Sequence, residues 1–140
     1  MSEIPHVSRQ VRSLVKSSGE LELSIRESKV APLKKNEILL KVEASPINPS
    51  DLGLLLAYAD ISKAEYSGTD ANPVVTAPIN PKLMVGLAPR VDKSMSAGNE
   101  GAGLVIACGD SDEAQALIGK TVAGLGPPMY SEYRTLKVHQ

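Results

Sequence analysis

The sequence predicts a mainly β fold, a barrel or a sandwich that carries only short helices. Several short runs alternate between apolar and polar residues with a period of two, which is the pattern of a half-buried strand. The 11 glycines and 10 prolines supply turn signals between these runs. A doubly wound nucleotide-binding sheet would instead alternate its strands with helices of about 10–15 residues, and no such alternation is visible.

The first elements along the chain are predicted to be a β-hairpin and a further strand. Residues 11–16 and 20–28 flank a Ser-Ser-Gly turn, and in the second run Leu21 and Leu23 alternate with polar residues. The same alternation returns at residues 38–42. A period of two over such short runs predicts three half-buried strands.

A short helix is predicted over residues 48–58. Asn48 is a favoured N-cap residue, and Pro49 suits the first helical position. The negative charge of Asp51 in the first turn complements the positive end of the helix dipole. Gly53 weakens the helix, because glycine loses more backbone entropy on folding than other residues do.

The second half of the chain is predicted to consist mainly of strands. Residues 61–97 contain many turn formers and prolines, so we expect edge strands and loops there, because proline cannot donate to a central ladder. Strands are predicted at 103–109, 120–126 and 131–138, and a short capped helix is predicted over 111–119.

Composition and charge argue against several classes of function. A formal net charge of −1 and 3% aromatic residues argue against nucleic acid or an anionic membrane as the main partner. One cysteine, Cys108, and two histidines, His6 and His139, cannot form an internal disulfide or a four-ligand structural zinc site. With no transmembrane stretch and no signal-peptide pattern in the sequence, we expect a soluble, cytoplasmic protein.

The stretch GNEGAG at 98–103 carries three glycines before an apolar run, and it allows three interpretations: a phosphate-binding loop, a metal site or a structural turn. A dinucleotide-binding fingerprint has the spacing G-x-G-x-x-G and leads into a helix. Here the spacing is G-x-x-G-x-G, the following residues are typical of a strand, and Glu100 places a negative charge where a phosphate would bind. The residues therefore predict a tight glycine turn that leads into a core strand.

Four patches in a fixed order add to this interpretation. They are VEASPINPSDL at 42–52, GNEGAGLV at 98–105, IGKTVA at 118–123 and YSEYRTL at 130–136. Together they resemble the N-terminal half of the medium-chain dehydrogenase/reductase superfamily, and the NPSD wording is typical of its zinc-free quinone oxidoreductase-like branch. The resemblance runs from about Arg9 to Val138 and is poor over 60–96.

The resemblance implies a fold and a domain. Residues 1–140 are expected to form a GroES-like domain, a partly open β-barrel with short helices that lies on the substrate side of the enzyme. In this superfamily a Rossmann cofactor domain follows the barrel, and this chain has no helix-rich segment of that kind. We therefore expect a piece of a longer oxidoreductase, homodimeric when full length, that binds NADPH weakly or not at all by itself.

The same resemblance implies that zinc is absent. Zinc-dependent members carry a cysteine ligand where this chain has Asn48, and a histidine ligand, within a GHE motif, where it has Asn99. Carboxamide side chains are poor zinc ligands beside thiolate and imidazole. Glu100 remains but cannot hold a zinc ion alone, and no cluster of cysteines is present for a second, structural zinc. We expect no metal ligands in this chain.

Asn48, Asp51 and Tyr58 are the candidate site residues. In the branch that the chain resembles, the positions of Asn48 and Asp51 lie near the nicotinamide, so Asn48 is expected to be catalytic and all three residues to contribute to cofactor binding. The amide of Asn48 can hydrogen-bond to the carbonyl of a quinone or an enone and polarise it for hydride attack. Local roles, a helix cap at Asn48 and a first-turn charge at Asp51, stay open beside this one. Gly53 stands where several quinone reductases have a tyrosine, and Tyr58 is the candidate substitute.

These expectations amount to one function and two alternatives. The function is that of the N-terminal catalytic domain of a zinc-independent, NADPH-dependent oxidoreductase, which transfers hydride to a quinone or an α,β-unsaturated carbonyl. The first alternative is a non-catalytic β-barrel that serves as a binding or assembly module. The second is a zinc alcohol dehydrogenase with atypical ligands. Metal analysis and the presence or absence of a following Rossmann domain separate the three.

Overall fold

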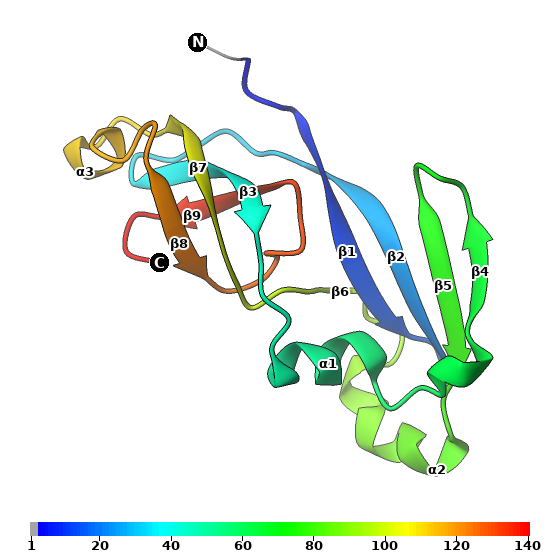
Figure 1. Cartoon of the computed structure of the whole chain (residues 1–140). Coiled ribbons are helices and arrows are strands. Elements are labelled where there is room, and N and C mark those ends of the chain that lie inside the picture. Colours follow the sequence, from blue (N-terminus) through cyan, green and yellow to red (C-terminus); the bar gives the residue numbers. More distant parts are fainter. Residues whose placement is uncertain (1–2) are drawn as a thin grey trace. The chain divides into compact units, whose positions relative to one another are not determined.

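The computed structural model describes residues 3–140, and these form two compact units. Unit 1 contains the described residues up to Gln10 together with Glu27–Pro46 and Gly98–Gln140, and unit 2 contains Val11–Arg26 and Ile47–Ala97. The described elements are nine strands, three short α-helices and two 3₁₀ turns (Figure 1). The prediction of a mainly β chain with short helices is confirmed.

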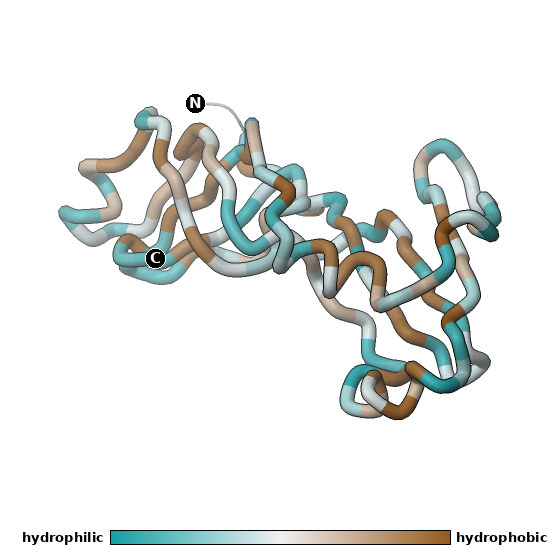
Figure 2. Tube along the Cα trace, turned by 60° about the horizontal axis from the view of Figure 1, so that its bottom comes forward, coloured by the Kyte–Doolittle hydropathy of each residue, from teal (hydrophilic) through white to brown (hydrophobic). Residues whose placement is uncertain are grey.

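Unit 1 is built on a four-stranded antiparallel sheet in the order β8-β7-β3-β9. In the central strand β3, Leu40 is paired with Val105 of β7 on one side and with Arg134 of β9 on the other. Hydrophobic and hydrophilic residues alternate along much of the chain trace (Figure 2), as the sequence predicts for half-buried strands. The elements are β3 (Glu37–Ala44), β7 (Glu100–Cys108), α3 (Asp112–Gln115), β8 (Thr121–Leu125) and β9 (Tyr133–Lys137).

A hydrophobic core packs against one face of this sheet. Leu40 and Met129 are 0% exposed, and Val105 and Leu136 of the neighbouring strand and loop segments are almost as deeply buried. These side chains come from three separate segments of sequence, so the core holds the sheet and the following loop together.

The structure corrects the prediction of a tight glycine turn in the GNEGAG stretch. Of its three glycines only Gly98 has a positive φ, +92°, and β7 begins two residues later, so Gly101 and Gly103 are strand residues. A Cβ on Gly101 would lie 2.6 Å from the Ser45 hydroxyl, and one on Gly103 would collide with the backbone of Lys41. Close approach of neighbouring backbones, rather than a turn, requires glycine at these two positions.

Unit 2 is built on a five-stranded sheet in the order β4-β5-β2-β1-β6. The predicted hairpin is confirmed as β1 and β2, and its turn closes where the Lys16 N–H donates to the Glu20 carbonyl at 2.8 Å, with Gly19 at a φ of +88°. The first residues of β1 and the last residues of β2 belong to unit 1. The strands are β1 (Val7–Val15), β2 (Glu20–Lys29), β4 (Glu65–Gly68), β5 (Pro73–Pro78) and β6 (Met95–Ser96).

The structure also corrects the prediction of edge strands and loops over 61–97. β4 is an edge strand, but β5 is an interior strand, since it pairs with β4 on one side and with β2 on the other. Pro73 and Pro78 stand at its two ends, and the four residues between them carry the ladder. The same segment forms three short helical turns, η1 (Ile61–Lys63), α2 (Pro81–Met84) and η2 (Val85–Arg90).

A second hydrophobic core belongs to unit 2. Its buried members are Val15, Leu21, Ala57, Ile79 and Leu87, and Val15 and Ala57 are 0% exposed. Ala57 is the C-cap of helix α1 (Pro49–Leu56), so this core anchors the end of the predicted helix. Among residues 3–140 no helix is both long and apolar enough to cross a membrane.

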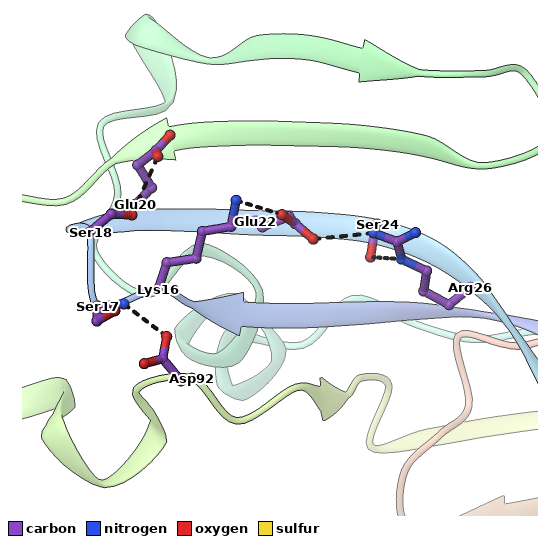
Figure 3. Close-up of polar contacts among 8 residues, drawn as sticks. All are labelled: Lys16, Ser17, Ser18, Glu20, Glu22, Ser24, Arg26 and Asp92. Carbon is purple, nitrogen blue, oxygen red and sulfur yellow. Dashed lines mark hydrogen bonds and ion pairs between the residues drawn. The ribbon is translucent and has the colours of Figure 1, made fainter.

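A row of polar contacts runs along β2 of unit 2. Lys16 Nζ lies 2.8 Å from Glu22 Oε2, and Arg26 Nη2 lies 3.4 Å from the other oxygen of the same carboxylate (Figure 3). At the hairpin turn, Asp92 Oδ1 accepts a hydrogen bond from the backbone N–H of Ser17 at 2.9 Å. The hydrogen bond from Lys16 lowers the pKa of Glu22, and the same bond raises the pKa of Lys16.

Candidate functional site

Asn48 and Asp51, two of the predicted site residues, lie together at the N-terminus of α1. Asn48 is the N-cap and Pro49 occupies the first helical position, as predicted. The Asp51 carboxylate accepts a hydrogen bond from the backbone N–H of Asn48 at 2.8 Å, and the two residues form a capping box. Asp51 is 1% exposed, whereas Asn48 is half-buried. The buried carboxylate therefore fixes the backbone that carries the Asn48 amide.

Tyr58, the third predicted site residue, lies beyond the opposite end of α1. A helix of 8 residues is about 12 Å long, so the structure does not place Tyr58 beside Asn48 and Asp51. Ala57 and Tyr58 have φ values of 45° and 60°, in the left-handed region that glycine adopts more easily. The Tyr58 side chain is 71% exposed. It stands on a strained backbone at the end of the helix, open to solvent.

Two side chains from other elements of unit 2 hold the C-terminal half of α1. The Leu54 carbonyl accepts hydrogen bonds from the Ser13 hydroxyl at 2.8 Å and from Arg90 Nη2 at 3.0 Å. Arg90 also donates to Ser13 Oγ at 3.0 Å and to the Gly53 carbonyl at 3.4 Å. Burial lowers the pKa of the Arg90 guanidinium. The sequence analysis missed Ser13 and Arg90, because neither belongs to a motif and both are far from α1 along the chain.

Asn99 and Glu100 stand at the start of β7 in unit 1. The Asn99 carbonyl accepts a hydrogen bond from the Gly126 N–H at 2.6 Å, and both Asn99 and Glu100 are half-buried. Asn48, whose position was compared with that of Asn99 in the sequence, belongs to unit 2. Within residues 3–140 no group of three or more His, Cys, Asp or Glu side chains is arranged to hold a metal ion.

An open, mainly apolar groove of about 710 Å³ also belongs to unit 1. The strand register produces it, because Ala44 of β3, Ala102 of β7 and Ala123 of β8 are paired in one row across the sheet. Glu100 contributes a carboxylate to the lining. Sequence reasoning missed this groove, since four separate segments build it: Ala44–Pro46, Glu100–Ala102, Ala123–Leu125 and Gln140.

The segment that leads from β3 to Asn48 is held by two hydroxyl groups. Ser45 Oγ donates to the Met129 carbonyl at 2.8 Å, and the Tyr130 hydroxyl donates to the Pro46 carbonyl at 2.9 Å. Met129 is fully buried in the core of unit 1, so its carbonyl offers a fixed anchor. The backbone two residues before Asn48 is therefore ordered by side-chain hydrogen bonds.

The arrangement at the start of α1 is suited to hydrogen bonding rather than to metal binding. Asn48 offers an uncharged amide, and the Asp51 carboxylate is engaged with the helix backbone. An amide donates to a carbonyl oxygen without ionising, so it can polarise a bound acceptor at any pH in the physiological range.

No protein-family model matches the sequence, and no curated protein matches it. Two solved structures do. A protein from Mesorhizobium loti is 21% identical, with a TM-score of 0.58 over 99% of this chain and 36% of its own. A protein from Bacillus thuringiensis is 22% identical, with a TM-score of 0.55 over 95% of this chain and 32% of its own. Both are described by the words "putative NADPH:quinone reductase".

These comparisons concern the fold. The chain spans about a third of the length of the two structures, and an identity near one residue in five is shared across almost the whole of it. The chain therefore has the fold of a part of two longer proteins that are described as NADPH:quinone reductases.

Proposed function

We propose that residues 1–140 are the GroES-like, substrate-side domain of a longer, zinc-independent oxidoreductase that transfers hydride from NADPH to a quinone or an α,β-unsaturated carbonyl. Two observations support this. The fold is shared with proteins described as NADPH:quinone reductases. The capping box fixes an amide-bearing residue, Asn48, at the start of α1.

The residues fit the nicotinamide end of the cofactor and not its phosphates. The N-terminus of α1 already holds the buried carboxylate of Asp51, which would repel a phosphate group there. The glycine-rich stretch runs into β7 rather than into a helix, so it offers no phosphate-binding loop. The phosphates of the proposed cofactor must therefore bind in a following domain.

The proposed mechanism gives each residue of α1 a simple task. NADPH, when bound, supplies the hydride. Asn48 donates a hydrogen bond to the carbonyl oxygen of the acceptor, where negative charge grows during the reaction, so this bond is stronger in the transition state than in the ground state. Asp51 holds the Asn48 backbone in place. The amide does not release a proton, so the proton that completes the reduction comes from solvent.

The proposal includes the setting of the protein. We expect a cytoplasmic enzyme with a small-molecule substrate, a homodimer once its cofactor domain is present, and no nucleic-acid or membrane partner. Tyr58 is placed at the rim of the cofactor site in this proposal. Its exposed ring and strained backbone are the observations that favour a contact role over a packing role.

Variants of Asn48 in the full-length protein test the proposal. Asn48→Ser keeps a good N-cap but removes the amide, so it separates the helix-capping role from the carbonyl-polarising one. We expect Asn48→Ser to fold normally and to lose about 100-fold in kcat for NADPH-dependent quinone reduction. Asn80, the N-cap of α2, is the matched control, since its side chain accepts from the Lys82 N–H at 3.0 Å. Full activity in Asn48→Ser, or an equal loss in Asn80→Ser, contradicts the proposed role.

A further inference from the structure

Helix α1 has few means of holding its own C-terminal half. It has 8 residues, includes Gly53 and carries no basic residue in its last turn. Isolated helices of this length are not stable in water. At its end the backbone turns left-handed at Ala57 and Tyr58, so the Leu54 carbonyl is not capped by a continued helix. Contacts from other elements must therefore hold this half of the helix.

Arg90 at the end of η2 supplies these contacts. Its guanidinium donates to the Leu54 carbonyl at 3.0 Å and to the Gly53 carbonyl at 3.4 Å. It also donates at 3.0 Å to the hydroxyl of Ser13, which is 0% exposed and itself donates to the Leu54 carbonyl at 2.8 Å. Arg90 and Ser13 thus form a closed triangle of hydrogen bonds around one carbonyl of α1.

The electrostatics of Arg90 agree with this role. None of the hydrogen bonds and ion pairs within residues 3–140 joins its guanidinium to a carboxylate; its acceptors are two carbonyls of α1 and one hydroxyl. A half-buried cation is costly unless polar groups compensate it. The negative end of the α1 dipole is such a group, and a cation at that end stabilises the helix.

We propose that Arg90 is a positioning residue of the candidate site: by holding the Gly53 and Leu54 carbonyls, it sets the position of the helix whose first turn carries Asn48 and Asp51. This role rests on the proposed function of Asn48. A guanidinium suits the task, because its planar fork reaches two carbonyls and a hydroxyl at once, which a single ammonium group cannot do with the same geometry.

Hydrogen exchange of the 140-residue chain, followed by NMR, tests the position of α1 without any assay of activity. In Arg90→Met we expect the backbone amides of Asn48 and Asp51 to exchange about tenfold faster than in the wild type, because a charged hydrogen bond is lost. Amides of the β2–β5 ladder, such as Leu23, are expected to change less than about twofold. Arg90→Lys should recover part of the protection.

Arg12 provides the matched control. Its guanidinium belongs to the same unit and also donates to a backbone carbonyl, that of Ser94 at 2.6 Å, but it does not touch α1. Arg12→Met should leave the exchange of α1 unchanged. Unchanged exchange of α1 in Arg90→Met overturns the proposal, and so does equal acceleration of α1 and the β2–β5 ladder.

The full-length protein supplies the second readout. If Asn48 acts as proposed, Arg90→Met lowers kcat for quinone reduction by about tenfold, leaves KM for NADPH within about twofold, and is partly rescued in Arg90→Lys. Loss confined to KM overturns the positioning role. A wild-type protein without NADPH-dependent reductase activity refutes the proposed function instead, and the exchange experiment then still decides whether Arg90 positions α1.

Discussion

The carboxylate of Asp51 lies 2.8 Å from the backbone nitrogen of Asn48 and is 1% exposed. A buried carboxylate that accepts from the N-cap backbone serves the helix and the candidate site together. It satisfies an N–H that the helix leaves free, and it fixes the backbone of the residue that we propose to contact the substrate. Stability and function are therefore coupled at this pair.

Replacing Asp51 tests that coupling. We expect Asp51→Ala to lower the free energy of unfolding by about 2 kcal/mol, because the capping box and a favourable charge at the helix N-terminus are both lost. Asp60→Ala is the control, since Asp60 caps the exposed three-residue turn η1 in the same way. Chemical denaturation of the two variants should show a clearly smaller loss for Asp60→Ala, and equal losses would contradict the special role of Asp51.

Two glycines should respond in opposite ways to alanine. A Cβ on Gly53 meets nothing within 4 Å, so Gly53→Ala should stabilise the chain by about 1 kcal/mol through higher helix propensity. A Cβ on Gly103 collides with the Lys41 backbone, so Gly103→Ala should destabilise it by about 2 kcal/mol or more. Thermal denaturation decides the signs. A stable Gly103→Ala variant would show that β7 and β3 do not approach as closely as described.

The left-handed backbone at Tyr58 gives a third test. Tyr58→Gly should raise the free energy of unfolding by about 1 kcal/mol, because glycine adopts this conformation without strain and the exposed ring contributes little packing. Tyr58→Val should lower it, since a β-branched residue tolerates positive φ poorly. Urea denaturation of both variants measures the difference, and the reverse order would show that the ring itself stabilises α1.

The sequence predicts α1 well because its signals are local. Asn48, Pro49 and Asp51 lie within one turn, and each favours its position for a physical reason that holds in any protein. The strand alternation at Leu21 and Leu23 is equally local, and the hairpin it predicts is confirmed. Where the chain's own neighbours in sequence determine the conformation, the structure follows the pattern.

The features that the sequence did not predict depend on distant partners. β5 is interior because β2 and β4 flank it, and its two prolines do no harm at the ends of the strand. Gly103 needs to be glycine because of Lys41, and Arg90 meets α1 at Leu54, 36 residues away in sequence. The positions of such contacts are set by the packing of whole elements, for which a single sequence carries no direct signal.

The Lys16–Glu22 pair predicts a pH dependence of stability. The hydrogen bond from Lys16 lowers the pKa of Glu22 from an ordinary value of 4.5, so the stability it contributes is present above that value and is lost as the pH falls through the lowered pKa. Glu22 raises the pKa of Lys16, so at the alkaline end the contribution is lost only as the pH rises through that raised value. The contribution at neutral pH is about 0.5–1 kcal/mol.

Glu22→Gln is the variant that isolates this effect. Its free energy of unfolding, measured from pH 7 down to pH 3, should fall less steeply than that of the wild type, and the two curves should converge at the acid end. Added salt should reduce the difference at pH 7, because the pair is partly exposed to solvent. Parallel curves would mean that the ion pair contributes nothing.

The central claim is that this chain is part of a zinc-independent NADPH:quinone reductase. Its most direct test is the rate of NADPH oxidation by the full-length protein with a simple benzoquinone, before and after treatment with a zinc chelator, combined with metal analysis. We predict quinone-dependent oxidation of NADPH that the chelator leaves unchanged, in protein that contains no stoichiometric zinc. Activity that disappears with the chelator and returns with zinc, or no oxidation of NADPH with any quinone or enone, would contradict the account.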